Sequence, residues 1–391
     1  MNIGNIHDCF GCGVCALACG RKIINIVLNK DGFYEPEITD IDNCTDCGLC
    51  VDVCSYSHND LSLKDVSISS FAGWSKDTTV REKCSSGGVA FELGKQMLSS
   101  GFKVCAVRYD VEKNQAEHYI ATTEEELIPS IGSKYIQSYT VDGFRQINRK
   151  EKYLVVGTPC QIDSFRRYIQ KYHCENNFIL LDFFCHGVPS KLMWDKYVRW
   201  AEAQVGKINK VSWRNKSTGW HDSYAMSIEG EQYENDKKQL ISSLSQGDMF
   251  FKLFLSDSCL NKACYEKCRF KWNQSSADIR IGDAWTSLFN DNEYGVNVVI
   301  SFTERGRNIF LLSNCCVRHY SFDDVAENQM NSLPLKTRLY TLVMHSLRNK
   351  SDSLINASEL IDRYRKRKRW KNRIIHPMNS MRKIIKMFNS R

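Results

Sequence analysis

Apolar runs alternate with helical patterns through the middle of the chain. Runs typical of buried strands cover residues 103–109, 152–156 and 178–184, while 3.6-residue periodicity predicts helices over 89–98 and 162–170. The second run leads through a glycine-bearing turn into its helix, which is the βα unit of a parallel sheet. These patterns predict a mixed α/β region.

The two ends of the chain have different patterns. Residues 23–28 and 33–38 are strand-like and flank Asn29-Lys30-Asp31-Gly32, so they predict a hairpin within an N-terminal α+β module of about 60 residues. Polar residues 62–70 suggest a linker. Residues 352–363 predict a helix that continues into a basic run. A length of 391 residues fits two or three domains, and a hydrophobic fraction of 42% is ample for their cores.

Cysteine spacing in the first 54 residues carries the clearest chemical signal. The pattern C-x2-C-x2-C-x3-C occurs in residues 9–19 and again in residues 44–54. Bacterial ferredoxins hold two [4Fe–4S] clusters with this spacing, and the fourth cysteine of each run binds the other cluster. One cluster is therefore assigned to Cys9, Cys12, Cys15 and Cys54. The other is assigned to Cys44, Cys47, Cys50 and Cys19.

Disulfides and structural zinc are the alternatives for these eight cysteines. Disulfides need an oxidising compartment, and residues 1–7 lack the basic and apolar regions of a secretory signal. Zinc ligands usually come in two pairs, whereas each run here supplies four closely spaced cysteines. The proline that usually follows the fourth cysteine is replaced by Gly20 and Ser55, which leaves the ligand set intact. Iron–sulfur binding in a reducing cytoplasm is favoured.

Four further cysteines suggest a third cluster. Cys160 and Cys185 each follow an apolar strand, so both are expected at the carboxyl edge of the sheet. A C-x3-C loop adds Cys264 and Cys268. Any one of these is more often a small buried residue than a ligand. In a chain that already holds clusters, the four together favour a third [4Fe–4S] site.

Charge is concentrated at the C-terminus. The formal net charge is +8, but twelve Lys or Arg and one acid fall within residues 362–391, so the rest of the chain is mildly acidic. Apolar residues between 374 and 388 are interleaved with these charges. Such a segment can lie on an anionic membrane surface, bind an acidic partner or be disordered. No nucleic-acid reading motif accompanies it, so no nucleic acid is expected.

A serine- and glycine-rich loop precedes the helix predicted at 89–98. Cys84-Ser-Ser-Gly-Gly88 would expose backbone N–H groups at the positive end of the helix dipole, where a phosphate can bind. A tight turn is the alternative interpretation. Further motifs are Gly132-Ser-Lys-Tyr135, Gly157-Thr-Pro-Cys-Gln161, Phe184-Cys-His-Gly187, Cys264 to Cys268 and Ala277-Asp-Ile-Arg-Ile-Gly-Asp283. Together these motifs resemble the coenzyme F420 hydrogenase/dehydrogenase beta subunit family, here with a ferredoxin domain in front.

The resemblance implies a flavin, typically FAD, beside one [4Fe–4S] cluster. It implies that Cys160, Cys185, Cys264 and Cys268 hold this cluster; because the family usually spaces its last two ligands C-x2-C, Cys259 is a reserve ligand. It places the flavin among Ser85, Ser86, Gly87, Gly88, Ser133, Lys134, Thr158 and Pro159. It divides the chain into a ferredoxin domain (1–60), the two family domains (61–150 and 151–320) and a helical basic tail (321–391).

Three residues are the candidates for catalysis. Lys134 would stabilise an anionic reduced flavin by its charge if it lies near the pyrimidine edge, and is otherwise a solvated lysine. His186 and Asp283 are candidate proton donors together with His221, and His186 is equally a core histidine. The segment 213–221, with tryptophans among Gly and polar residues, predicts a surface loop or lid, or an ordinary turn.

These observations predict an iron–sulfur flavoprotein oxidoreductase. Electrons would pass between the ferredoxin clusters and the flavin, and on to a two-electron carrier or small-molecule substrate. The partner is expected to be a redox protein or a small electron donor or acceptor. The resemblance adds a link to surface polysaccharide genes. A relay subunit without its own substrate and a redox-sensing iron–sulfur protein are the alternatives. The location expected is the cytoplasm, with the basic tail at the inner membrane surface.

Overall fold

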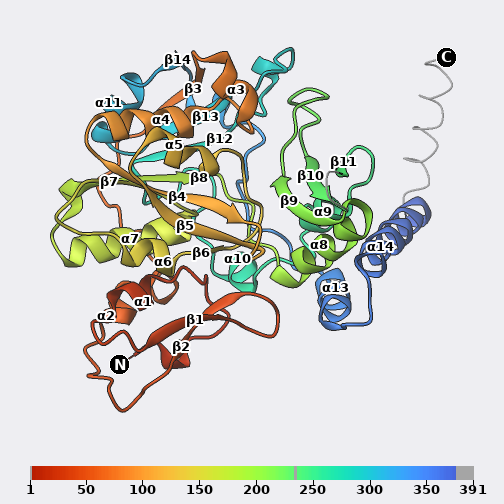
Figure 1. Ribbon diagram of the computed structural model, residues 1–391, viewed down its shortest axis with the longest axis horizontal. Coiled ribbons are helices and arrows are strands. Elements are labelled where there is room, and N and C mark those ends of the chain that lie inside the picture. The colour runs from red at the N-terminus through yellow and green to blue at the C-terminus, as the bar shows by residue number, and fades with distance from the viewer. Residues whose placement is uncertain (1, 233–235, 376–391) are drawn as a thin grey trace.

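A computed structural model describes residues 2–232 and 236–375. The N-terminal module contains η1 (Ile3–Asn5), α1 (Val14–Ala18), α2 (Leu49–Asp52) and η2 (Ser55–Ser57). Its hairpin pairs β1 (Ile24–Leu28) antiparallel to β2 (Tyr34–Ile38), which confirms the predicted hairpin. Figure 1 shows this module against one side of the main body.

The main body is built on a nine-stranded mixed sheet. Its strand order is β14-β3-β13-β12-β8-β7-β4-β5-β6. The strands are β3 (Ser69–Ser75), β4 (Lys103–Asp110), β5 (Gln115–Ala121), β6 (Ser138–Tyr139), β7 (Tyr153–Val156), β8 (Phe178–Phe183), β12 (Ile279–Asp283), β13 (Asn297–Ser301) and β14 (Cys315–His319). Neighbours β4, β7, β8 and β12 are parallel, so their carboxyl ends share one edge. The mixed α/β prediction is confirmed.

Helices cover both faces of this sheet (Figure 1). One face carries α4 (Val89–Ser99) and α11 (Glu304–Leu311), and the other carries α6 (Val141–Arg145) and α7 (Pro159–Lys171). Along β8, Ile179 and Leu181 pack on the α4 side and Leu180 packs on the α7 side. Burial on both faces explains why this strand reads as a continuous apolar run. Shorter helices are α3 (Thr78–Lys83), α5 (Glu124–Leu127), η3 (Ile128–Ser130), η4 (Glu175–Asn177), η5 (Ser287–Phe289) and α12 (Phe322–Val325).

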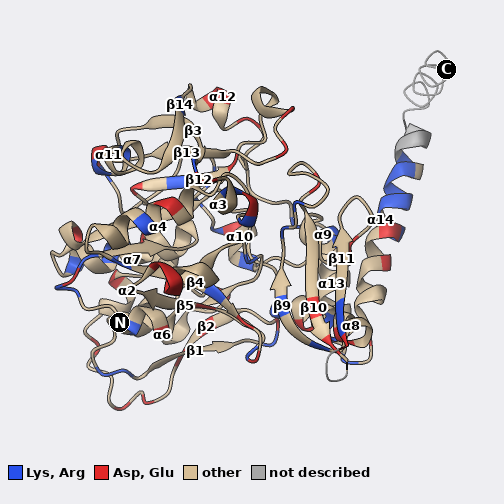
Figure 2. Ribbon diagram, turned by 45° about the horizontal axis from the view of Figure 1, so that its top comes forward, with Lys and Arg blue, Asp and Glu red and all other residues tan. Residues whose placement is uncertain are grey.

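A second, smaller body flanks the sheet. It contains the antiparallel strands β9 (Lys207–Ser212), β10 (Ala225–Glu231) and β11 (Lys237–Ser243). Its helices are α8 (Lys191–Val205), α9 (Met249–Phe254), α10 (Lys262–Glu266), α13 (Arg338–Arg348) and α14 (Leu354–Ile375). Leu354, Ala357 and Ile361 of α14 are buried in this body. Beyond them the helix projects outward with a dense run of Lys and Arg (Figure 2).

The N-terminal module is clamped between the two bodies. The backbone N–H of Lys191, the first residue of α8, donates to Gly32 O at 2.9 Å. The Ser190 hydroxyl donates to Asp31 O at 2.6 Å, and Arg348 of α13 pairs with the Asp31 carboxylate at 2.5 Å. On its other side the module packs on α7, with Val14 and Val53 in the same core as Phe165.

Candidate metal centres and active site

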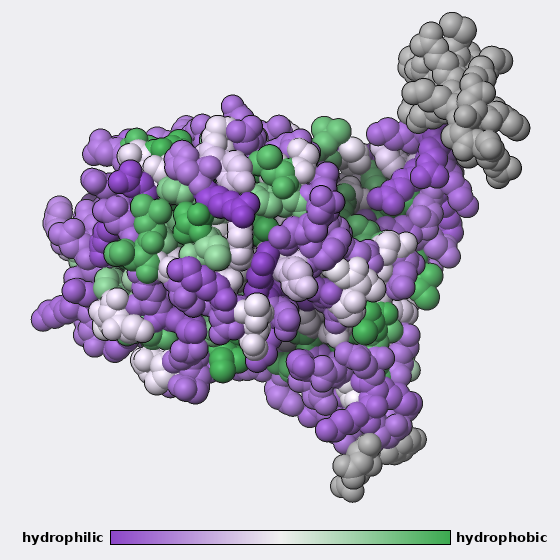
Figure 3. All heavy atoms as spheres, turned by 90° about the horizontal axis from the view of Figure 1, so that it is seen from above, coloured by the Kyte–Doolittle hydropathy of each residue, from purple (hydrophilic) through white to green (hydrophobic). Residues whose placement is uncertain are grey.

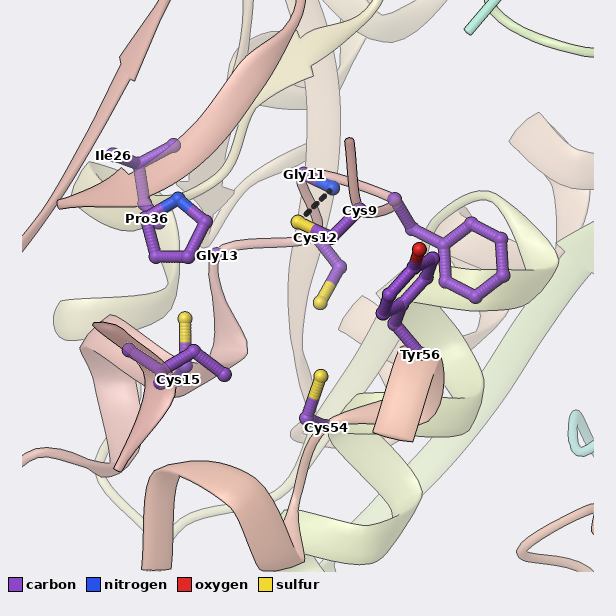
Figure 4. Close-up of a pocket in the computed structure, with 11 residues that line it drawn as sticks. Cys9, Gly11, Cys12, Gly13, Cys15, Ile26, Pro36, Cys54 and Tyr56 are labelled. Carbon is purple, nitrogen blue, oxygen red and sulfur yellow. Dashed lines mark hydrogen bonds between the residues drawn. The ribbon is translucent and has the colours of Figure 1, made fainter. Parts of the chain in front are cut away.

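Four cysteines of the N-terminal module surround one cavity, called here the ferredoxin cavity. Its lining includes Cys9, Cys12, Cys15 and Cys54. Their sulfurs point into a common space, and the Gly11 N–H donates to Cys9 Sγ at 3.3 Å (Figure 4). Gly11 has φ +64°, and a Cβ there would lie 2.4 Å from Tyr34 O, so only glycine fits. These are the four cysteines that the spacing assigned to one cluster.

Burial disfavours the thiolate form of Cys9, Cys12 and Cys15 and so raises the pKa of each. For Cys12, burial followed by the neighbouring Cys54 raises the pKa to about 11. Metal binding requires thiolates, so a positively charged metal group in the cavity would have to offset this cost. Four convergent sulfurs in an apolar cavity are a suitable donor set for an iron–sulfur cluster.

The other four ferredoxin cysteines lie farther out in the module. Cys50 is buried on α2, Cys19 and Cys44 are half-buried, and Cys47 is exposed. Burial raises the pKa of Cys50, and the nearby Cys47 and Cys19 raise it further. This arrangement leaves one candidate ligand accessible to a partner molecule.

A second cavity, called here the inner cavity, lies at the carboxyl edge of the sheet. Its lining includes Cys160, Cys185, Cys264 and Cys268. Cys160 stands in the first turn of α7, which begins with a capping box made by Thr158 and Gln161. The Thr158 hydroxyl lies 3.2 Å from Cys160 Sγ. Buried Lys271 donates from Nζ to Cys185 O at 2.6 Å and to His186 O at 3.0 Å.

The structure distinguishes Cys268 from the reserve ligand Cys259. Cys268 lines the inner cavity, whereas Cys259 is fully buried in the core of the smaller body, with its sulfur 3.5 Å from Met193 Sδ. Among the described residues, no group of three or more His, Cys, Asp or Glu side chains is arranged to hold a single metal ion.

The two cavities share a wall. Phe10 lines both, and its ring contacts Tyr56 and Phe270 at centroid distances of 5.5 and 6.0 Å. Asn261, which lines the inner cavity, donates from Nδ2 to Cys9 O at 3.0 Å. Ser164 of α7 places its Oγ 3.3 Å from Cys12 Sγ. Helix α7 therefore contacts one cysteine of each cavity, Cys160 and Cys12.

The serine- and glycine-rich loop packs against the sheet. Ser86 Oγ donates to Val296 O at 2.8 Å, and a Cβ on Gly87 would lie 2.7 Å from Gly73 O. The first amide of α4, Val89 N–H, donates to Asn297 Oδ1 at 3.2 Å. On its outer side, Ser85 Oγ accepts from Ser133 N–H at 2.8 Å, which joins this loop to the 132–135 motif.

Two lysines lie beside the loop. Lys134 Nζ donates to the carbonyls of Pro129, Ser130 and Ile131 at 2.8–3.1 Å, so it caps η3. Lys216 Nζ donates to the carbonyls of Arg81, Ser86 and Tyr294. Burial lowers the pKa of Lys134 to about 7 and that of Lys216 to about 8, against an opposing effect of Cys84.

A third cation beside the loop, Arg214, forms an ion pair with Asp283. Arg214 is buried and donates to Asp283 Oδ2 at 2.9 Å and to the Tyr135 hydroxyl at 3.1 Å. Burial opposes the charge of Arg214, but Asp283 and other neighbours outweigh it and raise its pKa. Trp220 Nε1 donates to Asp283 Oδ1 at 3.2 Å. The group formed by the Ser85–Gly88 loop, Lys134, Lys216, Arg214 and Asp283 is called here the Ser85 site. It contains three cations and one carboxylate.

The sequence matches three family descriptions along its length. Residues 8–57 match the 4Fe-4S dicluster domain. Residues 70–142 match the N-terminal part of the coenzyme F420 hydrogenase/dehydrogenase beta subunit, and residues 150–314 match its C terminus. The chain belongs to the coenzyme F420 hydrogenase/dehydrogenase beta subunit family. The expected resemblance is confirmed, and the chain is an iron–sulfur oxidoreductase-type member that carries a fused dicluster domain.

A comparison with solved structures finds a more distant similarity. It is to the F420-reducing [NiFe] hydrogenase complex from Methanosarcina barkeri, with 18% identity and a TM-score of 0.45 over 79% of this chain and 93% of that chain. A comparison with curated proteins finds no match.

The predicted site residues of this family member fall in two places. The Ser85–Gly88 loop, Lys134 and Asp283 belong to the Ser85 site, and Ser133 N–H donates to Ser85 Oγ, whereas Thr158 and Pro159 line the inner cavity. His186 Nε2 lies 2.7 Å from Asp257 Oδ1 and its ring packs on Phe254 at 4.7 Å. His221 Nε2 lies 3.3 Å from Phe289 O. Proton transfer by His186 or Asp283 stays a prediction.

Sequence reasoning missed Arg214, Lys216, Tyr135 and Lys271. Arg214 and Lys216 lie in the segment 213–221, for which a surface loop or lid and an ordinary turn were both predicted. The segment contains a turn with Ser217 and Thr218 exposed, but Trp213 and Trp220 are 1% and 0% exposed and belong to the core. Trp220 stacks on Trp285 at 4.6 Å with an interplanar angle of 13°. Arg214 lies over the rings of Tyr224 and Trp285, 4.6 and 5.5 Å from their centroids, so the available signal was a basic residue in an aromatic-rich segment.

Proposed function

We propose that this chain is an iron–sulfur flavin oxidoreductase with three [4Fe–4S] clusters and one FAD. Cys9, Cys12, Cys15 and Cys54 would hold one cluster, and Cys19, Cys44, Cys47 and Cys50 the outermost one. Cys160, Cys185, Cys264 and Cys268 would hold the third. When bound, clusters supply single-electron exchange and a flavin supplies conversion to two-electron chemistry.

The observation that carries this proposal is the wall shared by two four-cysteine cavities. The Phe10 side chain is 6% exposed and excludes water from between them. The Cys9 carbonyl accepts a hydrogen bond from Asn261 of the opposite cavity, which ties the two cavities together at this point. Such a buried contact would suit electron transfer between two clusters.

The Ser85 site supports an anionic cofactor. Lys134 and Lys216 donate only to carbonyl oxygens in the bonds given above, and the single carboxylate, Asp283, is already paired with Arg214. Buried positive charge in excess is costly unless an anion compensates it. The phosphates of FAD, or its reduced ring, would supply this negative charge. Asp283 would then act by orienting Arg214.

A protein partner is the favoured electron donor or acceptor. The family takes its name from beta subunits of hydrogenases and dehydrogenases, which work with other subunits. The exposed Cys47 would place the outermost cluster where such a partner can approach. A relay subunit without its own substrate is the second candidate, supported by the same exposure. The two-electron substrate, the polysaccharide link and the cytoplasmic location stay predictions.

Metal and flavin analysis of the anaerobically purified full chain tests the proposal. We expect about twelve irons and one flavin per chain, by four irons for each four-cysteine set. Cys268→Ser should lower the iron content to about eight, and its matched control Cys259→Ser should leave it at about twelve. About eight irons in the unsubstituted chain, or equal iron in the two variants, would remove the third cluster. Reduction of the bound flavin by reduced deazaflavin or NAD(P)H then separates an enzyme from a relay.

The projecting part of α14 supports contact with an anionic membrane surface. Its exposed side chains beyond Asp362 are mostly Lys and Arg, together with Trp370, which is 65% exposed. In Figure 3 the described end of the chain beside the grey atoms is hydrophilic. Within residues 2–232 and 236–375, no helix has the length and hydrophobicity to cross a bilayer. The apolar positions between 376 and 388 lie outside the described residues. Sedimentation with anionic but not with neutral vesicles, weakened by Trp370→Ser, is the expected result.

A further inference from the structure

We infer that the inner cavity is the electron-accepting end of the metal chain, because Lys271 makes it more electropositive than the ferredoxin cavity. This inference rests on the proposed function, since it requires a cluster in each cavity. It sets the direction of flow: electrons enter at the dicluster domain and move inward toward the Ser85 site.

Lys271 places a fixed positive charge in the wall of the inner cavity. The residue is 8% exposed and lines the cavity with the four cysteines. Its ammonium group donates to the carbonyls of Cys185 and His186, which are neutral and leave its charge uncancelled. The backbone on either side is held by Arg280, which donates to Phe270 O at 3.1 Å and Trp272 O at 2.8 Å. Leaving the cavity wall would cost the ammonium group its two hydrogen bonds to the Cys185 and His186 carbonyls.

Helix α7 adds to the same effect. Cys160 is the second residue of this 13-residue helix, where the backbone dipole is positive. Both features favour negative charge inside the inner cavity.

The ferredoxin cavity has the opposite surroundings. Its lining beyond the cysteines is Ile3, Phe10, Gly11, Gly13, Ile26, Pro36 and Tyr56. No Lys or Arg is among these described residues. Two carboxylates, Asp8 and Glu35, lie beside Cys9, and Glu35 accepts from Asp8 N–H at 3.4 Å. Hydrogen bonds to sulfur do not distinguish the cavities, because a hydroxyl lies 3.3 Å from Cys12 Sγ and another 3.2 Å from Cys160 Sγ.

Charge near a cluster shifts its reduction potential in a known direction. Reduction adds one negative charge, so a fixed cation stabilises the reduced form and raises the potential. In the proposed step one electron leaves the cluster in the ferredoxin cavity, which is oxidised, and reduces the cluster in the inner cavity. No bond is made or broken and no proton is transferred. Lys271 would take no direct part in this step; it would act only through the effect of its charge on the potential of the inner cluster.

A redox titration of the full chain, followed by electron paramagnetic resonance, tests the inference. The inner signal is the one that Cys268→Ser loses, and we expect it to have the highest midpoint potential in the unsubstituted chain. Lys271→Met should lower that midpoint so that the preference of the electron for the inner cavity falls at least tenfold, or about 59 mV for one electron. Lys271→Arg should retain the original midpoint. The control Lys262→Met removes a cation two residues before Cys264 that pairs instead with Asp8, and should leave the inner midpoint unchanged.

Two results would overturn the inference. One is an inner midpoint at or below those of the dicluster domain in the unsubstituted chain, a measurement that does not depend on any Lys271 variant folding well. The other is an unchanged inner midpoint in Lys271→Met. If either occurs with about twelve irons present, the proposed function stands and only the direction of flow is wrong. If the unsubstituted chain holds about eight irons, the third cluster and this inference fail together.

Discussion

The ferredoxin cavity and the inner cavity are each lined by four cysteines, but the two sets come from different kinds of structure. The first takes its cysteines from residues 9–54, with only Cys15 in a helix, α1, and the others in loops. The second takes them from residues 160–268, with two in the helices α7 and α10 and two in the loops that follow β8 and α10. A local site depends on the conformation of a few glycines, whereas a distributed site depends on the packing of a whole sheet. Substitutions at the inner cavity should therefore affect the stability of the whole fold, whereas substitutions at the ferredoxin cavity should have a more local effect.

The largest effect is expected from the buried ion pair under the inner cavity. Arg280 and Asp182 are both 0% exposed and joined by two 2.7 Å contacts, and Arg280 also holds the segment after Cys268. Arg280→Met leaves Asp182 buried and unpaired, so we expect a loss of about 3–5 kcal/mol in unfolding free energy. Denaturant titration measures this, and iron content should fall by about four.

The matching control is the double variant Arg280→Met with Asp182→Leu. Replacing both partners removes the unpaired charge, so much of the stability should return while the support for Phe270 and Trp272 does not. Equal instability of the single and double variants would contradict this account.

A smaller effect is expected in the ferredoxin cavity. Gly11→Ala would force a residue with a Cβ into φ +64° and place that Cβ 2.4 Å from Tyr34 O. We expect a cost of about 1–3 kcal/mol and the loss of about four irons, with the inner cluster retained. Gly20→Ala is the control, because no atom lies within 4 Å of its added Cβ. Equal iron loss in both variants would mean that the loop conformation at Gly11 is unimportant.

The Ser85 site differs from both cavities in responding to pH. The pKa of Lys134 is lowered by burial to about 7 from its ordinary 10.5, so between these values the unfolded chain binds more protons than the folded one. Stability of the flavin-free chain should therefore rise with pH across this window. Flavin affinity should instead fall, by up to about tenfold per pH unit for one lysine, as the cations are lost.

Fluorescence titration with FAD at pH 6.5 to 9 measures the second effect. Lys134→Arg keeps its charge over this range and should weaken the pH dependence. A flavin affinity that is constant with pH in the unsubstituted chain would count against an anion held by the lysines.

The smallest expected effect concerns the hydroxyl groups beside the sulfurs. Ser164 Oγ accepts from Ser55 N–H at 2.9 Å and lies beside Cys12 Sγ. Ser164→Ala should cost about 0.5–1.5 kcal/mol and lower the midpoint of the cluster in the ferredoxin cavity only. Ser164→Thr, which keeps the hydroxyl, is the comparison, and a shift in the inner midpoint instead would reverse our assignment of this contact.

The contrast between a local site and a distributed site also explains which parts of the fold and of the sites could be predicted from the sequence. Cys9, Cys12 and Cys15 lie within one turn of loop, so their convergence is a local property visible in the spacing. The strands at 152–156 and 178–184 were also predictable, because burial on both faces leaves a continuous apolar run. That β13 lies between β3 and β12 was not, since antiparallel insertion depends on long-range pairing.

The charged groups of the inner cavity and of the Ser85 site were hidden for a related reason. Lys271 sits between Phe270 and Trp272, and nothing in these neighbours indicates that its ammonium will meet the Cys185 carbonyl. Arg214 and Asp283 are 69 residues apart and meet only because the smaller body packs against the edge of the sheet. Spacing reports neighbours along the chain, and these partners are neighbours only in the fold.

The clamp on the β1–β2 turn has a kinetic consequence. Contacts from Lys191, Ser190 and Arg348 hold Asp31 and Gly32, so the dicluster domain is docked against the body that contains the inner cavity. A separate carrier would have to diffuse, collide and dissociate at every turnover. If the inner cavity holds the proposed cluster, electron transfer to it is instead a first-order event, whose rate should stay the same however dilute the protein becomes.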